Sequence, residues 1–156
     1  MLLLLLRHAE AVDHATDDAS RQLTHKGVDQ AARVAKYLRR KKLIPDRVLT
    51  SPVTRAKQTA VLVAEAVDRP LSLEPDLRPG MRPEQALALL AAEPGLETVL
   101  LVGHEPDLGR LAAALLGAAD GHVFRLRKAS LTGIELARPE IGRGELQFLV
   151  PARLMA

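Results

Sequence analysis

The sequence predicts an α/β fold with a mostly parallel central sheet of about six strands. Short apolar runs alternate along the chain with longer segments in which apolar residues recur at helical spacing. This alternation is typical of parallel strands joined by helices that cover both faces of a sheet. The first run, Leu2 to Leu6, consists only of leucines, as expected for a strand buried on both faces. At 156 residues the chain is expected to form one domain, residues 1–156.

After the first strand we expect a loop and then a helix. Residues 13–21 are rich in Asp, Ser and Thr, which favour loops. Thr24 then precedes residues 27–42, whose apolar side chains recur on one helical face. This helix ends in four cations, Arg39 to Lys42, which suit the negative end of a helix dipole. A polybasic docking site is the alternative interpretation of the run.

The remaining elements continue the alternation of strands and helices. Residues 47–50 form a short β-rich run, and Ser51 and Pro52 then open the next expected helix. Pro139 and Gly142 are expected to form the connection between two late strands. The expected strands after the first are 47–50, 71–73, 98–102, 130–137 and 145–150, and the later expected helices are 53–67, 84–92 and 108–116.

Composition excludes several classes of protein. The chain has no cysteine, so disulfides, thiolate catalysis and cysteine-based zinc sites are excluded. One Tyr and two Phe are too few for base stacking, so we expect no nucleic-acid partner, and RNA binding through Arg39 to Lys42 is a distant alternative. The net charge of +3 suits anionic substrates or acidic partners. No run approaches the roughly 20 apolar residues of a membrane helix, so we expect no membrane association and a cytoplasmic location.

Two histidines stand directly after expected strands. Arg7 and His8 follow the leucine run, and His104 follows the run 98–102. A single histidine at a strand end is commonly an ordinary turn residue. Two such strands in one parallel sheet would bring both imidazoles to the edge where ligands bind. Because an imidazole can act as a nucleophile and a guanidinium can hold a phosphoryl group by two hydrogen bonds, the pattern indicates phosphoryl chemistry.

Arg55 adds a further cation to this edge of the sheet. It lies in the first turn of the helix that follows strand 47–50. The N–H groups of a first helical turn bind anions, and acidic side chains are the ones normally favoured there. A surface charge is the simpler interpretation of Arg55 alone. Beside Arg7, His8 and His104, however, it would complete a phosphate clamp.

Three ordered motifs carry a family resemblance: Arg7-His8-Ala9-Glu10, Ser51-Pro52-Val53-Thr54-Arg55-Ala56-Lys57-Gln58-Thr59 and Gly103-His104-Glu105-Pro106. They resemble the histidine phosphatase superfamily, although Ala9 stands where glycine is more usual. The short chain and the segments 21–27 and 77–80 are similar to the small bacterial SixA-type phosphohistidine phosphatases. The resemblance implies a three-layer α/β/α, phosphoglycerate mutase-like fold in a minimal form without a helical cap.

The resemblance also implies a role for each residue of the clamp. His8 would be the nucleophile that takes the phosphoryl group and forms a covalent phosphohistidine. Arg7 and Arg55 would bind the phosphoryl oxygens, and His104 would donate a further hydrogen bond. Arg21 is a candidate fourth phosphate contact. We expect no cofactor, and because the histidines show no metal-binding spacing we expect a metal-independent reaction.

The expected substrate is phosphohistidine on a signalling or phosphotransfer protein. Larger members of the superfamily insert a general acid after the third strand, whereas residues 76–82 of this chain contain no such insertion. An alkoxide needs a proton in order to leave, but an imidazole, with a pKa near ~6.5, does not. Asp18 is a possible acid, although an ion pair with Arg21 is the simpler interpretation. The alternatives are a small-molecule phosphomonoester phosphatase of the same superfamily and, more distantly, a non-catalytic phospho-ligand binding module.

Overall fold

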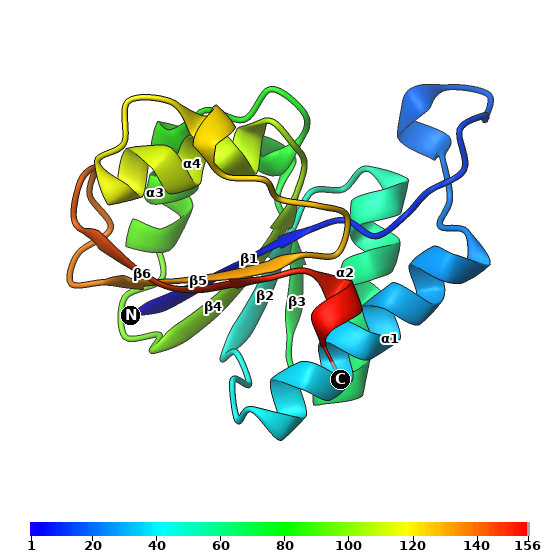
Figure 1. Cartoon of the computed structure of the whole chain (residues 1–156), viewed down its shortest axis with the longest axis horizontal. Helices are drawn as coiled ribbons and strands as arrows, with labels where there is room; N and C mark the ends of the chain where they lie inside the picture. Colours follow the sequence, from blue (N-terminus) through cyan, green and yellow to red (C-terminus); the bar gives the residue numbers. More distant parts are fainter. Residues whose placement is uncertain (156) are drawn as a thin grey trace.

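The computed structural model describes residues 1–155, which contain a six-stranded sheet (Figure 1). The strand order is β3-β2-β4-β1-β5-β6. β3, β2, β4 and β1 run parallel to one another, whereas β5 runs antiparallel to its neighbours β1 and β6. The prediction of a mostly parallel sheet of about six strands is therefore confirmed. The strands are β1 (Leu2–Arg7), β2 (Arg47–Thr50), β3 (Leu71–Leu73), β4 (Thr98–Gly103), β5 (Leu131–Leu136) and β6 (Gly144–Val150).

Four α-helices of the described residues cover the two faces of this sheet. α1 and α2 lie against one face and α3 and α4 against the other, which gives the predicted three layers (Figure 1). The leucines of β1 alternate between the two cores: Leu4 and Leu6 pack with α1 and α2, whereas Leu3 and Leu5 pack with α3 and α4. None of these helices is long and apolar enough to cross a membrane. They are α1 (His25–Arg40), α2 (Thr54–Val67), α3 (Pro83–Ala91) and α4 (Asp107–Leu116).

The first helix differs from its predicted range at both ends. α1 begins at His25 rather than at residue 27, because Thr24 caps the helix by accepting a hydrogen bond from the Gly27 N–H. It ends at Arg40, and Lys42 then adopts a φ of 57°, outside the range of a right-handed helix. The basic run therefore forms the C-terminal end of α1, as its simpler interpretation predicts.

The segment 13–21, which was expected to be a loop, contains a short 3-10 helix, η1 (Asp18–Ser20). Asp17 caps this turn, because its carboxylate accepts hydrogen bonds from both the N–H and the hydroxyl of Ser20. Three residues are too few for a periodic pattern in the sequence, so composition indicated a loop here. The turn determines where Asp18 and Arg21 lie.

The carboxyl ends of three strands meet at one edge of the sheet. In the parallel β1–β4 pair, Arg7 lies opposite Gly103, so His8 and His104 leave the sheet next to each other. β2 ends beside β4, which places the start of α2 at the same edge. The register of the parallel strands thus brings together the three segments that carry the predicted site.

The start of α1 lies against the chain that leaves β1. A Cβ atom at Gly27 would overlap the carbonyl oxygen of Glu10, so only glycine fits at this position. The Thr24 hydroxyl also donates a hydrogen bond to the Glu10 carboxylate over 2.7 Å. These contacts hold the loop that carries His8 close to the amino end of α1.

Candidate active site

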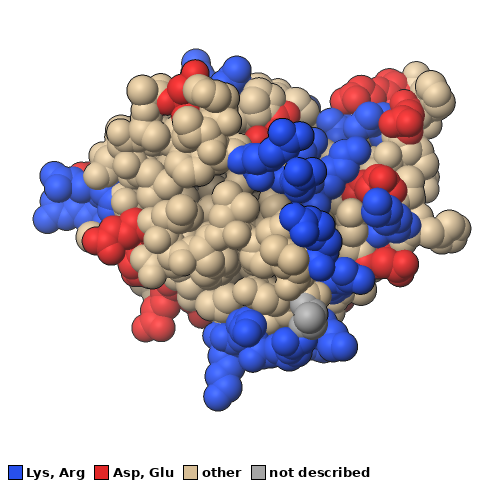
Figure 2. Space-filling model, in the orientation of Figure 1, with Lys and Arg blue, Asp and Glu red and all other residues tan. Residues whose placement is uncertain are grey.

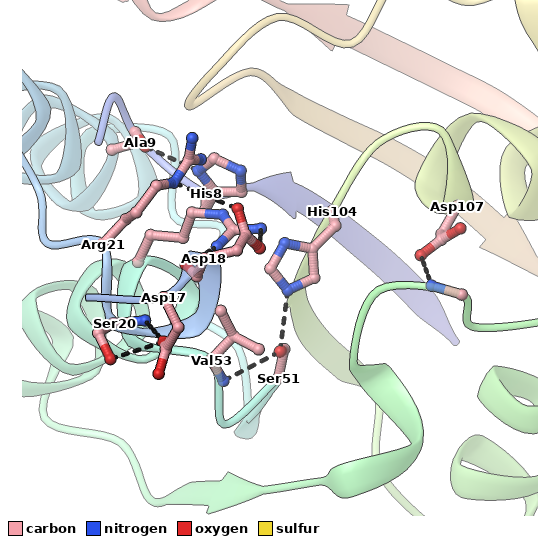
Figure 3. Close-up of polar contacts among 12 residues, drawn as sticks. His8, Ala9, Asp17, Asp18, Ser20, Arg21, Ser51, Val53, His104 and Asp107 are labelled. Carbon is pink, nitrogen blue, oxygen red and sulfur yellow. Dashed lines mark hydrogen bonds and ion pairs between the residues drawn. The ribbon is translucent and has the colours of Figure 1, made fainter. Parts of the chain in front are cut away.

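Two imidazole rings face each other at the carboxyl edge of the sheet. His8 follows β1 and His104 follows β4, and their ring centroids lie 5.3 Å apart with the ring planes at 54°. Both side chains are nearly buried, with 4% and 3% exposed. Figure 3 shows the two rings at the end of their strands, together with Asp18 and Arg21 from the region of η1. The pairing of imidazoles predicted from the strand ends is therefore present in the structure.

The peptide that follows His8 orients its ring. His8 Nδ1 lies 2.8 Å from the carbonyl oxygen of Ala9. A carbonyl oxygen only accepts hydrogen bonds, so Nδ1 carries the hydrogen, and the Nε2 of the neutral ring keeps its lone pair. The Ala9 N–H donates to the Thr59 hydroxyl over 3.0 Å, and this hydroxyl donates to the Arg55 carbonyl oxygen over 2.8 Å. Thr59 therefore ties the loop of the nucleophile candidate to α2.

Burial keeps His8 neutral at neutral pH. It lowers the pKa of His8 to about 4; the hydrogen bond to Ala9 opposes this shift, and the positive charges of Arg55, Arg7 and Lys128 add to it. The charges of both predicted guanidiniums thus act on this ring. A neutral imidazole has the lone pair that a nucleophile requires.

The hydrogen bonds of His104 differ from those of His8. Its Nε2 lies 2.9 Å from Ser51 Oγ, which already accepts a hydrogen bond from the Val53 N–H (Figure 3). The serine hydroxyl can donate its own hydrogen to His104 Nε2, and in that tautomer the hydrogen of the neutral ring is on Nδ1. Burial lowers the pKa of His104 to about 3, the neighbouring His8 and Arg55 add to this shift, and the Asp18 carboxylate opposes it.

A segment far along the chain holds Arg7 in place. Arg7 Nη1 donates to the carbonyl oxygen of Leu126 over 2.9 Å, and the Ala129 N–H donates to the Arg7 carbonyl oxygen over 3.1 Å. Burial lowers the pKa of the Arg7 guanidinium, the Glu105 carboxylate opposes this shift, and Arg55 adds to it. Arginine nonetheless keeps its charge in proteins, so Arg7 brings a fixed cation to the site.

Arg55 and Arg21 share one acidic partner, Asp18. Arg55 lies nearly buried in the first turn of α2, as predicted. Its Nη1 donates to the Asp18 carbonyl oxygen over 3.0 Å, and its Nη2 lies 3.2 Å from Asp18 Oδ2. Arg21 Nε lies 3.5 Å from Asp18 Oδ1, so the expected ion pair of Asp18 with Arg21 is present. The second pair, with Arg55, was not predicted.

Three buried nitrogens of the site have no hydrogen-bond partner among residues 1–155, namely Arg7 Nε, Arg55 Nε and His104 Nδ1, and the buried Arg21 Nε has only its ion-pair contact with Asp18 at 3.5 Å. Buried donors in native proteins are nearly always satisfied, so a group of unsatisfied donors around two imidazoles indicates an anion-binding site. Among residues 1–155, no group of three or more His, Cys, Asp or Glu side chains is placed to hold a metal ion. Independence from metal stays a prediction.

The sequence did not predict the residues that orient the clamp. Ser51 and Thr59 lie inside one of the motifs, but their hydrogen bonds to His104 and Ala9 join segments that are 53 and 50 residues apart. Leu126 contacts Arg7 through its backbone carbonyl, which any residue type would supply. The sequence could have indicated a role for Ser51 and Thr59 only through their membership of the motif 51–59.

These features define an α/β protein that gathers two imidazoles and fixed guanidiniums at the carboxyl edge of its sheet, an arrangement suited to binding a phosphoryl group. A family model described as the histidine phosphatase superfamily (branch 1) matches residues 3–79. An uncharacterized protein of Picosynechococcus sp. is 38% identical over 143 residues, which cover 86% of this chain and 84% of that protein. The phosphohistidine phosphatase SixA of Escherichia coli is 35% identical over 119 residues, 74% of each chain. This chain belongs to the histidine phosphatase superfamily.

A solved structure supports the same assignment. The structure of the protein histidine phosphatase SixA complexed with tungstate matches this fold with a TM-score of 0.91 and 27% sequence identity, and the match covers 100% of both chains. The predicted superfamily, its SixA-type branch and the phosphoglycerate mutase-like fold are therefore confirmed.

Proposed function

We propose that this protein hydrolyses phosphohistidine on a partner protein through a covalent phosphohistidine on His8. In the first step, His8 Nε2 attacks the phosphorus atom of a phosphohistidine whose other ring nitrogen carries a proton, and the bond between phosphorus and the substrate ring breaks, so that the substrate leaves as neutral imidazole. In the second step, a water oxygen attacks the phosphorus, the bond to Nε2 breaks, and inorganic phosphate leaves. Dividing the hydrolysis into two displacements replaces one difficult step by two easier ones. We also propose that enzyme and partner meet in the cytoplasm.

The observation that carries this proposal is that His8 is buried with its Nδ1 bonded to the Ala9 carbonyl oxygen, which leaves a lone pair on Nε2. The hydrogen bond to Ala9 fixes the hydrogen on Nδ1, and the lowered pKa leaves Nε2 unprotonated at neutral pH. Proteins to which this chain is similar are named phosphohistidine phosphatase SixA and protein histidine phosphatase SixA. Their names support the substrate class, and the geometry supports the covalent step.

The other residues of the site stabilise the transferring group in this proposal. Phosphoryl transfer passes through a loose transition state, so positioning and charge matter more than covalent assistance. Arg7 and Arg55 would hold the phosphoryl oxygens, and Arg21 would add a further contact. His104 would donate from Nδ1, the nitrogen that its contact with Ser51 leaves without a partner. Fixed donors of this kind need no reorganisation during the reaction.

The contacts of Asp18 suit a binding role better than a proton donor. Its carboxylate pairs with Arg55 and Arg21, and a carboxylate in such pairs accepts hydrogen bonds. We propose that it occupies the guanidiniums in the free enzyme and that the phosphoryl oxygens replace it. A leaving imidazole needs no strong proton donor, so phosphohistidine is a better match to this site than a phosphomonoester. The acid role of Asp18 stays a prediction that a Asp18→Asn variant tests.

A substrate panel with two histidine variants tests the proposed function. His8→Gln should remove both turnover and the acid-labile, ³²P-labelled phosphoenzyme while the protein remains folded by circular dichroism. The matched control is His14→Gln, because His14 is an exposed histidine of the loop after β1. This variant should retain both signals. A labelled phosphoenzyme that persists in His8→Gln would contradict the covalent role of His8.

The same panel separates the alternative functions. The substrates are a phosphohistidyl carrier protein, free phosphohistidine, an aryl phosphate and several phosphomonoester metabolites. We expect the two phosphohistidine substrates to be turned over fastest. Much faster turnover of one metabolite would assign the protein to small-molecule phosphatases. Binding of phosphate without turnover of any substrate would identify a non-catalytic phospho-ligand binding module.

A further inference from the structure

A groove lined with basic residues begins at Arg7 and extends to the C-terminal turn of the chain. Its volume is about 410 Å³. The segment 125–128 forms one side, and the turn η4 (Ala152–Leu154) and the start of α1 form the other. In the space-filling view, Lys and Arg side chains form a band over this face, next to the end of the chain (Figure 2). The cations that line the groove beyond Arg7 are Lys26, Arg125, Arg127, Lys128 and Arg153.

These cations are available to a binding partner, although the charge of Lys128 also helps to lower the pKa of His8. All five are exposed, and none forms an ion pair with another residue of the described range 1–155. The acidic residue in the lining is Glu10, and its carboxylate already accepts a hydrogen bond from the Thr24 hydroxyl. The groove extends beside a smaller one that adds Asp29 and Arg33, and the Arg33 guanidinium donates to the Ala152 carbonyl oxygen. The whole surface therefore has an excess of positive charge.

The groove is connected directly to the active site. Leu126, in the middle of the basic segment, is buried and accepts the hydrogen bond from Arg7 Nη1. The Ala129 N–H, at the end of the segment, donates to the carbonyl oxygens of Arg7 and His8. A molecule that occupies the groove would therefore lie next to a phosphoryl group on His8.

We propose that this groove binds an acidic surface of the phosphohistidine-bearing partner, beside the phosphorylated residue. The inference rests on the proposed function and names the feature of the partner that the enzyme recognises. One phosphoryl group uses only the guanidiniums of the active site, whereas five further cations match an extended anionic surface. The lining contains no aromatic side chain on which a base could stack, which favours an acidic protein over single-stranded nucleic acid.

Charge reversal at the far end of the groove tests this inference. We choose the double variant Lys26→Glu/Arg153→Glu, because neither residue is among the charges that shift the pKa of His8 or His104. The matched control is Arg40→Glu/Lys42→Glu, which makes the same change of charge on exposed residues at the C-terminal end of α1. This control also tests the alternative interpretation of the basic run at that helix end.

The probes are free phosphohistidine and a phosphohistidyl phosphotransfer domain with acidic residues around its histidine. A second version of the domain has these residues replaced by glutamine. For the acidic domain, Lys26→Glu/Arg153→Glu should lower kcat/KM by about tenfold or more, because opposite charges at an interface accelerate association. The loss should shrink as ionic strength rises from about 0.05 M to about 0.3 M. Free phosphohistidine and the glutamine version should be hydrolysed at nearly the same rate by the variant and the wild type.

Two outcomes would overturn the inference. One is an unchanged kcat/KM of the groove variant for the acidic domain, or an equal loss in the control at the end of α1. The other is tight binding of a single-stranded RNA oligonucleotide, stronger than that of the acidic domain and lost in the groove variant. If wild-type protein hydrolyses neither phosphohistidine substrate, the proposed function fails. In that case, the dissociation constants of the unphosphorylated acidic domain for the wild type and for the groove variant are compared. Weaker binding to the groove variant would still support binding of the domain in the groove.

Discussion

Replacing Thr59 by valine removes one hydroxyl from the junction between α2 and the loop of His8. Thr59 is completely buried, and its hydroxyl accepts the hydrogen bond from the Ala9 N–H and donates to the Arg55 carbonyl oxygen. Valine has nearly the same shape but makes neither hydrogen bond. The Ala9 N–H, which belongs to a completely buried residue, would then have no acceptor. A buried donor without a partner costs about 1–3 kcal/mol.

This loss translates into a measurable change in thermal stability. For a chain of 156 residues, an entropy of unfolding of about 2.1 cal/mol/K per residue means that 2 kcal/mol corresponds to a fall in Tm of about 6 °C. Turnover should fall as well, because the carbonyl oxygen of Ala9 orients the ring of His8. Misplacement of a reacting atom by a fraction of an ångström lowers kcat on the order of tenfold.

The matched control is Thr59→Ser, which keeps the hydroxyl and removes one methyl group. Calorimetry and steady-state kinetics on phosphohistidine should show most of the stability and nearly all of the kcat restored in this variant. A Thr59→Val protein with wild-type Tm and kcat would show that this hydrogen bond does not position the nucleophile loop. Equal losses of kcat in both variants would mean that packing of the methyl group, rather than the hydroxyl, is responsible.

Four further predictions concern the pH dependence of activity, the pH dependence of stability, Asp18 and metal. Since the pKa of His8 is lowered to about 4, hydrolysis should persist at pH 5 and decline only near pH 4, whereas a decline centred near pH 6.5 would contradict a buried, neutral nucleophile. For stability, His8 and His104 bind fewer protons when folded than when unfolded, so their contribution is fully present above about pH 6.5 and is lost as the pH falls through about 4 for His8 and about 3 for His104. Urea unfolding at pH 7 and pH 4.5 measures the part of this loss that lies above pH 4.5. Asp18→Asn should bind inorganic phosphate several-fold more tightly with little change in kcat for phosphohistidine, whereas a selective loss of phosphomonoester turnover would support the acid role. Treatment with EDTA should leave turnover unchanged, and an inhibition reversed only by an added metal would refute metal independence.

The fold was predictable because its signals are periodic and local. Leu2 to Leu6 read as a strand buried on both faces, and their side chains do alternate between the two cores. The positions of His8 and His104 followed from the same reasoning, because residues after neighbouring parallel strands share one edge. Arg55 followed from its place in the first turn of a helix.

The parts of the site that were not predicted depend on contacts between distant segments. Leu126 lies 119 residues from Arg7, and the contact uses a backbone carbonyl that no sequence pattern identifies. The pair of Asp18 with Arg55 spans 37 residues and depends on a three-residue turn within a polar segment. Residue type and spacing carry no information about such contacts, which form only when the sheet has placed the segments together.

The two imidazoles differ in role because their hydrogen-bond partners differ. A carbonyl oxygen can only accept, so the Ala9 contact fixes the hydrogen of His8 on Nδ1 and leaves Nε2 as an electron-pair donor. A hydroxyl can donate as well as accept, so the Ser51 contact allows the tautomer of His104 that carries its hydrogen on Nδ1, the nitrogen without a partner among residues 1–155. Burial and the neighbouring guanidiniums keep both rings neutral, and in the proposed function the same guanidiniums would attract the phosphoryl group. In the proposed mechanism, burial and these charges together keep His8 unprotonated and the guanidiniums also bind the phosphoryl group, so the reaction would need no additional base at neutral pH.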